Sequence, residues 1–195
     1  MKKLLFTAAI AVLGFTSVNA QEDTTVGGFE KGDVYVSGTV GFTTTSVADV
    51  DSNQFEVSPS VGYFISENIA LEAGLSYGSG EDFAEDKTSS FGGSLGANYF
   101  FTPSNTFSFT LGAGVNYKAD KTEPNGGEES TVNTFGIAVS PGISYFVSDS
   151  FSLRASFGAL SYDNAKGDWD NAEAVDTFGL NLDLSEIKFG VAYKF

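Results

Sequence analysis

Polar and apolar residues alternate along most of this chain. From Asp33 onward an apolar residue occupies nearly every second position, and clusters of turn residues or acidic residues interrupt the pattern at regular intervals. The clearest example runs from Phe107 to Tyr117, where every odd position is apolar and every even position is serine, threonine, glycine or asparagine. A β-strand repeats every second residue, and a helical period of 3.6 residues cannot produce this pattern. The sequence therefore predicts an all-β domain.

Eight strands of this kind are predicted, each with one apolar face. These faces span Val34 to Phe42, Phe55 to Tyr63, Ile69 to Tyr77, Phe91 to Tyr99, Phe107 to Tyr117, Phe135 to Tyr145, Phe151 to Ala159 and Phe178 to Phe195. The strands are joined alternately by short turns (66–68, 102–106, 148–150) and by long polar loops (43–53, 79–89, 118–131, 163–176). An even number of antiparallel strands, with turns at one end and loops at the other, predicts an eight-stranded up-and-down transmembrane β-barrel.

The two faces of the predicted strands indicate which side points outward. The non-apolar face consists mainly of Gly, Ser, Ala, Thr and Asn, which fit a narrow lumen but are too polar for a hydrocarbon core. The other face has aliphatic residues in mid-strand and aromatic residues at the strand ends, as in interfacial girdles. The predicted girdle residues are Phe55, Tyr77, Phe91, Tyr117, Phe135 and Phe178 at one rim and Tyr63, Tyr99, Tyr145 and Tyr193 at the other. Phe55 to Tyr63 spans nine residues, enough for a tilted strand to cross the hydrocarbon.

The first 20 residues predict a secretory signal peptide. Lys2 and Lys3 supply the positive start, residues 4–18 the apolar stretch and residues 18–20 a small-residue cleavage site. No later stretch has 18 or more consecutive apolar residues, so membrane insertion would have to be as strands. The prediction is therefore a signal peptide (1–20), a short N-terminal lead-in (21–32) and an outer-membrane β-barrel domain (33–195). The exported chain is expected in the outer membrane of a Gram-negative bacterium.

Two prolines and one change of pattern mark irregular places in the strands. Pro59 and Pro141 lie inside predicted strands of a closed sheet, where proline removes a ladder hydrogen bond and is expected only at a bulge. In the eighth strand the apolar positions change parity between Leu184 and Ile187, which predicts a further bulge near residues 185–186.

Charge and missing residue types exclude several functions. Ten Lys and Arg stand against 25 Asp and Glu, and the net charge of −15 becomes −17 once Lys2 and Lys3 leave with the signal peptide. Nucleic-acid binding is not expected, because phosphate recognition depends on Lys and Arg. The chain has no cysteine and no histidine, and barrel enzymes resemble one another in relying on a histidine. No carboxylate pair stands out as a hydrolase site. We expect no enzymatic activity, no cofactor and no metal centre.

The long loops are rich in carboxylates. They carry Glu81, Asp82, Glu85, Asp86, Asp120, Glu123, Glu128, Glu129, Asp163, Asp168, Asp170, Glu173 and Asp176. Such clusters could bind divalent cations, but no spacing matches a known loop motif, so solvated loops are the preferred interpretation. Trp169, in the last loop, is either a loop anchor or a contact residue for a partner.

Charged residues also occur on the face predicted to line the lumen. They are Glu56, Glu72, Arg154 and Lys188, with Asp183 as a fifth member. Charges in a narrow lumen are costly unless they are paired. We interpret the cluster as a structural plug of ion pairs, because the interior of an eight-stranded barrel is about wide enough for side chains. A gate or selectivity filter whose pairs rearrange is the alternative.

Three phenylalanines add to this prediction. Phe64, Phe100 and Phe146 each follow a girdle tyrosine by one residue, so they should point inward at the end with the short turns. Three rings there would narrow the exit from the lumen. Alternatively, residues so close to the turns rotate outward and join the girdle.

Three segments repeat one pattern and carry a resemblance to a known family. They are Pro59 to Asn68, Gly96 to Thr102 and Pro141 to Asp149, and the chain ends in Gly190-Val191-Ala192-Tyr193-Lys194-Phe195. With these segments the mature chain resembles the small outer-membrane β-barrels of the OmpA, OmpX and OmpW types. Tyr193 and Phe195 are similar to the family's C-terminal signal for the barrel-assembly machinery. We expect a monomer that contacts outer-membrane lipid and lipopolysaccharide.

Three functions are compatible with the sequence. The first is a non-enzymatic integral barrel with a largely plugged lumen and a structural or surface-interaction role in the cell envelope. The second, which an OmpW-type resemblance implies, is a small porin-like channel for ions or hydrophobic solutes. The third is a soluble periplasmic carrier of the lipocalin type, which the girdles and the small polar face disfavour. The sequence names no solute and no surface partner.

Overall fold

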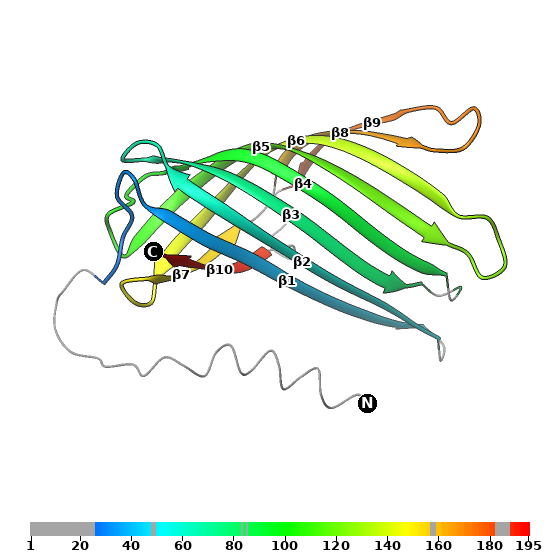
Figure 1. Ribbon diagram of the computed structural model, residues 1–195, viewed down its shortest axis with the longest axis horizontal. Coiled ribbons are helices and arrows are strands. Elements are labelled where there is room, and N and C mark those ends of the chain that lie inside the picture. The colour runs from blue at the N-terminus through cyan, green and yellow to red at the C-terminus, as the bar shows by residue number, and fades with distance from the viewer. Residues whose placement is uncertain (1–25, 48–49, 83, 85, 157–158, 182–187) are drawn as a thin grey trace.

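Antiparallel β-strands make up the fold. The computed structural model describes residues 26–47, 50–82, 84, 86–156, 159–181 and 188–195 (Figure 1). Within this part the strands are β1 (Val34–Val47), β2 (Val50–Phe64), β3 (Ile69–Glu81), β4 (Lys87–Phe100), β5 (Phe107–Glu123), β6 (Ser130–Phe146), β7 (Phe151–Ser156), β8 (Ala159–Gly167), β9 (Val175–Asn181) and β10 (Lys188–Lys194). The described residues include no helix that is long and apolar enough to cross a membrane.

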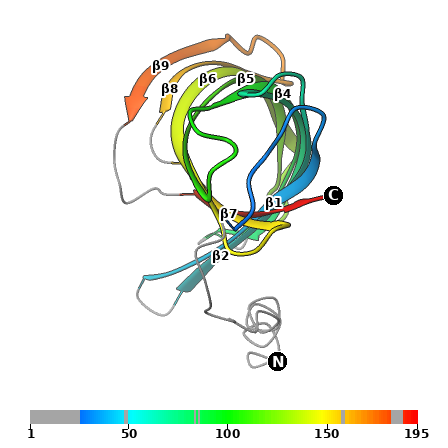
Figure 2. The same cartoon turned by 90° about the vertical axis from the view of Figure 1, so that its left-hand side faces the viewer.

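The sheet closes on itself, as Figure 2 shows in a view along the barrel. Each strand from β1 to β6 pairs with the next, β6 pairs with β7, β7 with β10 and β10 with β1. β8 continues the seventh predicted strand along β6, and β9, the start of the eighth, pairs with β8. The prediction of a closed eight-stranded antiparallel barrel is confirmed.

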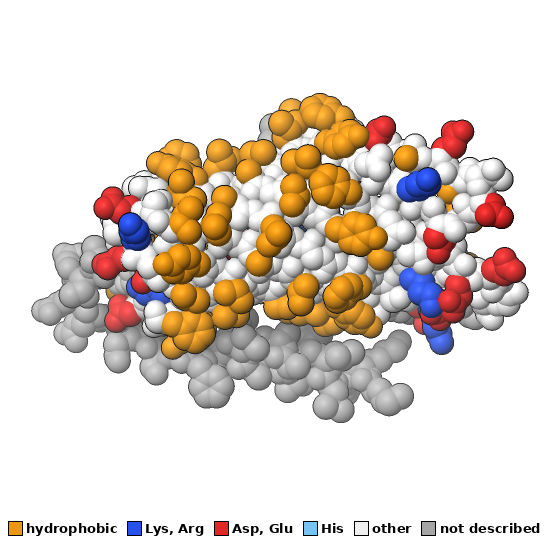
Figure 3. Space-filling model, turned by 45° about the horizontal axis from the view of Figure 1, so that its top comes forward, with side chains coloured by type: hydrophobic (Ala, Val, Ile, Leu, Met, Phe, Trp, Pro, Cys, Tyr) orange, Lys and Arg blue, Asp and Glu red, His pale blue; other side chains and the backbone are white. Residues whose placement is uncertain are grey.

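The apolar face of the strands points away from the barrel axis. Phe42, Leu95 and Phe109 are exposed on the wall, whereas the residues on either side of each in the sequence are glycine, serine or threonine. Figure 3 shows the consequence, because orange apolar side chains cover the middle of the wall and the charged side chains gather at its two ends. This surface suits hydrocarbon and not water.

The two prolines behave differently. The β2–β3 ladder keeps one register on both sides of Pro59 and lacks only the pairs at Ser58 and Pro59, so the bulge predicted there does not form. The missing N–H costs one contact with β3, and the β1–β2 ladder runs on without interruption. Next to Pro141, in contrast, the β6–β8 ladder is shifted by one residue against the β6–β7 ladder. The outward positions of the seventh strand therefore become even, as at Tyr162.

The eighth strand also changes parity. Phe178 and Leu180 in β9 and Phe189 and Val191 in β10 are all exposed, so the outward positions are even before the change and odd after it. The bulge predicted near residues 185–186 lies outside the described residues.

The two ends of the barrel differ in how they are built. At one, which we name the turn end, β2–β3, β4–β5 and β6–β7 are joined by residues 65–68, 101–106 and 147–150, and residues 26–33 and Phe195 lie there too (Figure 1). At the other, the loop end, the β5–β6 and β8–β9 hairpins project beyond the wall. All buried aromatic residues of the described chain lie at the turn end.

Candidate functional site

Five aromatic side chains fill the turn end of the lumen. This aromatic cluster consists of Phe29, Tyr35, Phe64, Phe100 and Phe146, and none of its members exposes more than 3% of its surface. Phe29 lies at the centre, with its ring centroid 4.7 Å from that of Phe64, 4.8 Å from Phe146 and 5.4 Å from Phe100. Phe29 stacks on Phe64 and packs edge-to-face on Phe100 and Phe146, and rings packed this closely exclude water.

Strand parity places three of these rings. Phe64, Phe100 and Phe146 each end a strand directly after an outward tyrosine, so the side chains alternate from lipid face to lumen. The structure brings them together inside the barrel, and they do not rotate outward into the girdle.

The sequence analysis missed the other two members. Tyr35 had a signal, because it is an aromatic residue at a lumen position between Val34 and Val36. Phe29 had none, because it lies before the first strand, where no periodicity assigns it a face. Its backbone N–H donates to the carbonyl of Pro103 (2.8 Å), which fixes the segment across the mouth of the barrel.

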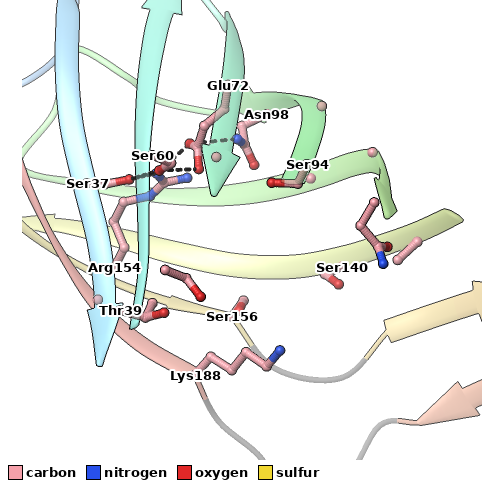
Figure 4. Close-up of a pocket in the computed structure, with 18 of the residues that line it drawn as sticks. Ser37, Thr39, Ser60, Glu72, Ser94, Asn98, Ser140, Arg154, Ser156 and Lys188 are labelled. Atoms are coloured by element: carbon pink, nitrogen blue, oxygen red, sulfur yellow. Dashed lines mark hydrogen bonds and ion pairs between the residues drawn. The ribbon is translucent and has the colours of Figure 1, made fainter. Parts of the chain in front are cut away.

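An ion pair between Glu72 and Arg154 lies next to the aromatic cluster, and Figure 4 shows its two members. Nη1 of Arg154 is 2.8 Å from Oε2 of Glu72. The Tyr35 hydroxyl also donates to Oε2 (2.7 Å), the Asn98 amide donates to the same oxygen (3.2 Å), and the Ser60 hydroxyl donates to Oε1 (2.9 Å). Both carboxylate oxygens of Glu72 are thus satisfied, which a charge taken out of water requires.

Arg154 joins the ion pair to the aromatic cluster. Its Cζ lies 5.3 Å from the centroid of Tyr35 and 5.8 Å from that of Phe100, distances typical of cation–π contacts. The guanidinium group therefore covers the aromatic rings on the lumen side. The aromatic cluster and the ion pair together form a plug at the turn end of the lumen.

Glu56 and Lys188 do not join this plug, contrary to the predicted cluster of lumen charges. Glu56 is six residues along β2 from Gly62, the partner of Glu72, which corresponds to about 20 Å along the strand. Ser58 donates a hydrogen bond to Glu56 (3.3 Å), and Lys188 extends into the lumen away from the ion pair (Figure 4). Neither forms an ion pair with any described residue. Asp183 lies outside the described residues.

A cavity of about 480 Å³ occupies the lumen on the loop side of the ion pair. Glu56 and Lys188 line it, together with many glycines and small polar residues such as Ser94, Asn116 and Ser140. The glycine and serine residues on facing strands leave this space because their side chains are small. The cavity can hold water or a small polar solute.

The acidic loops are engaged in contacts within and between the hairpins. Lys118 pairs with Asp120, Lys121 pairs with both Glu123 and Glu129, and the Asp86 carboxylate accepts the backbone N–H of Asn125. The Lys121 ammonium lowers the pKa of Glu123 below the usual range of a glutamate. Across the described chain, no group of three or more acidic side chains is placed to hold a metal ion. Trp169 is exposed beside the backbone of Gly167.

The ten predicted girdle residues all face outward. Each is exposed on the wall: Phe55, Tyr63, Tyr77, Phe91, Tyr99, Tyr117, Phe135, Tyr145, Phe178 and Tyr193. The turn-end girdle has further members that the prediction omitted, namely Phe101, Phe107 and Phe151. Tyr193 packs edge-to-face on Phe151 (4.9 Å) and on Phe195 (5.1 Å), so the chain's C-terminal aromatic residues belong to this girdle.

Comparison with known proteins gives one family and several similar folds. The sequence model described as "Outer membrane protein beta-barrel domain" matches residues 8–195. Comparison with curated proteins finds no match.

Among solved structures, Neisserial surface protein A (NspA) superposes with a TM-score of 0.52 at 21% identity, over 83% of this chain and 97% of that one. OprG from Pseudomonas aeruginosa superposes with a TM-score of 0.53 at 13% identity, over 86% of this chain and 98% of that one. The N-terminal β-barrel domain of OprF from the same organism superposes with a TM-score of 0.48 at 19% identity, over 85% of this chain and 98% of that one. At these identities the similarity to NspA and OprG shows the fold.

Proposed function

Given that this chain belongs to the outer membrane protein beta-barrel domain family, we propose that it is a non-enzymatic integral barrel whose lumen is sealed. Its role would be to support the cell envelope or to present its loops at the cell surface. The observation that carries the proposal is the plug of aromatic cluster and ion pair at the turn end. Short turns of outer-membrane barrels face the periplasm, so the sealed end would be the periplasmic one.

The family and the wall of the barrel support this location. The predicted resemblance to small outer-membrane barrels is confirmed, and the family implies the bacterial outer membrane. Exposed residues such as Leu75, Leu95 and Phe109 cover the wall where a lipocalin-type carrier would need polar side chains. Removal of residues 1–20 on export remains part of the proposal, because they lie outside the described residues.

The absence of an activity is proposed from the chemistry of the lumen. Its one close pair of charged groups, Glu72 and Arg154 among the described residues, is held by hydrogen bonds and an ion pair. A carboxylate in such a network is a structural group and is not free to act as an acid or base. The chain also has no histidine or cysteine to replace it.

Two partner classes follow from the surface. The outward apolar residues fit lipid and the lipid part of lipopolysaccharide, as expected for a monomer. Tyr193 and Phe195 are exposed at the turn end, where they would be accessible to the barrel-assembly machinery.

Conductance of the refolded mature chain in planar lipid bilayers tests the seal. We expect no conductance steps, because five buried rings and the ion pair fill the turn end of the lumen. A variant that carries both Phe100→Ala and Arg154→Ser should conduct, which would show that the assay detects an open lumen. Sustained conductance steps of the unmodified barrel would overturn the proposal.

A small channel is the second candidate, and the cavity in the loop half of the lumen favours it. If ions cross the barrel, they pass Glu56 and Lys188, two of the charged residues that line the cavity. Substitution Glu56→Gln would then change the cation selectivity of any conductance, whereas Glu67→Gln, on a turn outside the lumen, would not.

A further inference from the structure

The segment before the first strand ends inside the barrel. In this N-terminal segment (Val26–Gly32), Phe29 is only 1% exposed although it belongs to no strand. Its ring contacts each of the other four members of the aromatic cluster, which come from β1, β2, β4 and β6. The strands thus form a socket, and Phe29 occupies it.

Hydrogen bonds to main-chain atoms hold the N-terminal segment on both sides of Phe29. The Thr106 hydroxyl donates to the carbonyl of Val26 (3.0 Å), and Nζ of Lys194 donates to that of Gly28 (2.6 Å). The N–H of Gly32 donates to the carbonyl of Phe64 (2.9 Å). All three hydrogen bonds are made to main-chain atoms, so they depend on the path of the segment's backbone and not on its side chains.

The glycines before Phe29 allow this path. Gly28 has a φ of +142°, and a Cβ there would lie 2.7 Å from the carbonyl oxygen of Ser104. A Cβ on Gly27 would overlap the ring of Phe146. Residues with side chains cannot approach the socket in this way. The mouth therefore selects two glycines followed by an aromatic residue.

We propose that the turn-end mouth is a peptide-binding site whose ligand is the chain's own N-terminal segment, bound as Gly27-Gly28-Phe29. The bound segment is the outermost layer of the plug. The inference deepens the proposed function and rests on it for the assignment of the mouth to the periplasmic side.

The contacts of the segment also explain how it could leave without unfolding the barrel. Apart from the bond between Gly32 and Phe64 at the end of β2, no described strand pairs with it, and Glu30 and Lys31 are exposed. A cavity of about 570 Å³ lies beside it and is lined by Glu30, Lys31 and parts of the two turns that include Asn68 and Thr102. One aromatic anchor and a few hydrogen bonds hold it, whereas the wall is held by continuous ladders.

Trypsin cleavage after Lys31 in the folded, detergent-solubilised mature barrel tests whether the segment is bound. A protease needs an extended, detached substrate, so the bound segment should be cut slowly. Phe29→Ala should raise the rate by about tenfold or more, because it removes the anchor. Phe101→Ala, a change at the outward girdle of the same end, should leave the rate unchanged. Cleavage after Lys121 at the loop end gives the reference rate.

Two glycine variants test the backbone path of the segment separately from the burial of Phe29. Gly28→Ala adds both a strained backbone and a clash with Ser104, whereas Gly32→Ala, at a φ of +98° with open space around its Cβ, adds strain alone. We expect the larger increase in cleavage from Gly28→Ala. Equal effects of the two would contradict the selection of glycine by the mouth.

A second measurement does not depend on these variants folding. The chain has no cysteine, so a Val26→Cys, Thr106→Cys double variant can be cross-linked selectively with a short bismaleimide. It should cross-link within one chain, whereas Val26→Cys with Asn125→Cys at the loop end should not. Equal cleavage of unmodified and Phe29→Ala barrels, or equal cross-linking of both pairs, would overturn the inference. A conducting barrel that still binds its segment would instead overturn only the proposed function.

Discussion

The turn end and the loop end of this barrel solve the same problem in opposite ways. Both must fill or hydrate a lumen whose strands alternate in the same pattern. The turn end fills it with five aromatic rings and an ion pair in which both carboxylate oxygens of Glu72 accept hydrogen bonds. The loop end leaves a cavity lined by small residues, with Glu56 and Lys188 beside it.

The difference shows that small and large lumen residues have separate tasks. Large inward residues occur where the turns bring strand ends together, and there they exclude water. Glycine and serine occur where the strands continue toward the loops, and there water can satisfy any charge. We therefore expect the turn end to carry the packing energy of the lumen, and matched substitutions at the two ends can test this.

The largest expected effect comes from the aromatic cluster. Phe64→Ala should lower the free energy of unfolding by about 4 kcal/mol, because it loses both the transfer of the ring and the packing around it. Phe91→Ala, on the lipid face, should cost about 2 kcal/mol, since lipid fills the space that the ring leaves. Urea unfolding of the barrel in lipid vesicles measures both. Equal losses would mean that the turn end is not a packed core.

The second comparison is between Arg154, which forms an ion pair with Glu72, and Lys188, which forms none with a described residue. Arg154→Ala should destabilise the barrel by about 3 kcal/mol, because Glu72 would keep its charge without its partner. Lys188→Ala should cost less than about 1 kcal/mol, since its amine faces the cavity. The same unfolding experiment checks the pair. A Glu72→Gln change added to Arg154→Ala should restore part of the loss, and failure to do so would contradict the charge explanation.

A smaller effect is expected from two buried serines at the turn end. The Ser108 hydroxyl donates to the carbonyl of Phe109 (2.9 Å) and accepts the N–H of Thr102 (3.1 Å), so Ser108→Ala should cost about 1 kcal/mol. The hydroxyl of Ser152 has no hydrogen-bond partner among the described residues. Ser152→Ala should therefore be neutral or stabilising. A loss as large as that of Ser108→Ala would point to a bound water.

The smallest effect belongs to the loop end and depends on pH. Hydrogen bonds from Asn164 and from the Tyr162 hydroxyl lower the pKa of the Asp176 carboxyl below its usual range. A lowered pKa adds stability above the ordinary aspartate value of about 4, and this stability is lost as the pH falls through the lowered value. The protection factors of the amides in the β8–β9 hairpin against hydrogen exchange should fall below about pH 4. Asp176→Asn should remove this pH dependence while the amides of β3 and β4 stay unchanged.

Strand parity made much of this molecule predictable. It assigned Phe64, Phe100 and Phe146 to the lumen and Phe91 or Tyr145 to the wall, because side chains alternate whatever the strands pair with. Parity also assigned Glu72 and Arg154 to one face. It did not give the height of a side chain along the barrel axis, which depends on the stagger between strands.

This missing height explains the main error. Glu56 and Lys188 share the lumen face with Glu72, so the sequence suggested a single cluster. The stagger places them on the side of the cavity instead. Phe29 was missed for another reason, because its burial depends on the closed mouth and not on a local pattern. The prediction of a bulge at Pro59 was wrong, because the ladder lacks the pairs at Ser58 and Pro59 without changing register.

The bond between Lys194 and Gly28 has a consequence for the order of events during assembly. It joins positions 166 residues apart in the chain. Lys194 lies in β10, the strand whose pairing with β1 closes the ring. Contacts this distant in sequence form late, because the intervening chain must be ordered first. The N-terminal segment therefore reaches its final place last, and its docking would report that the barrel is complete.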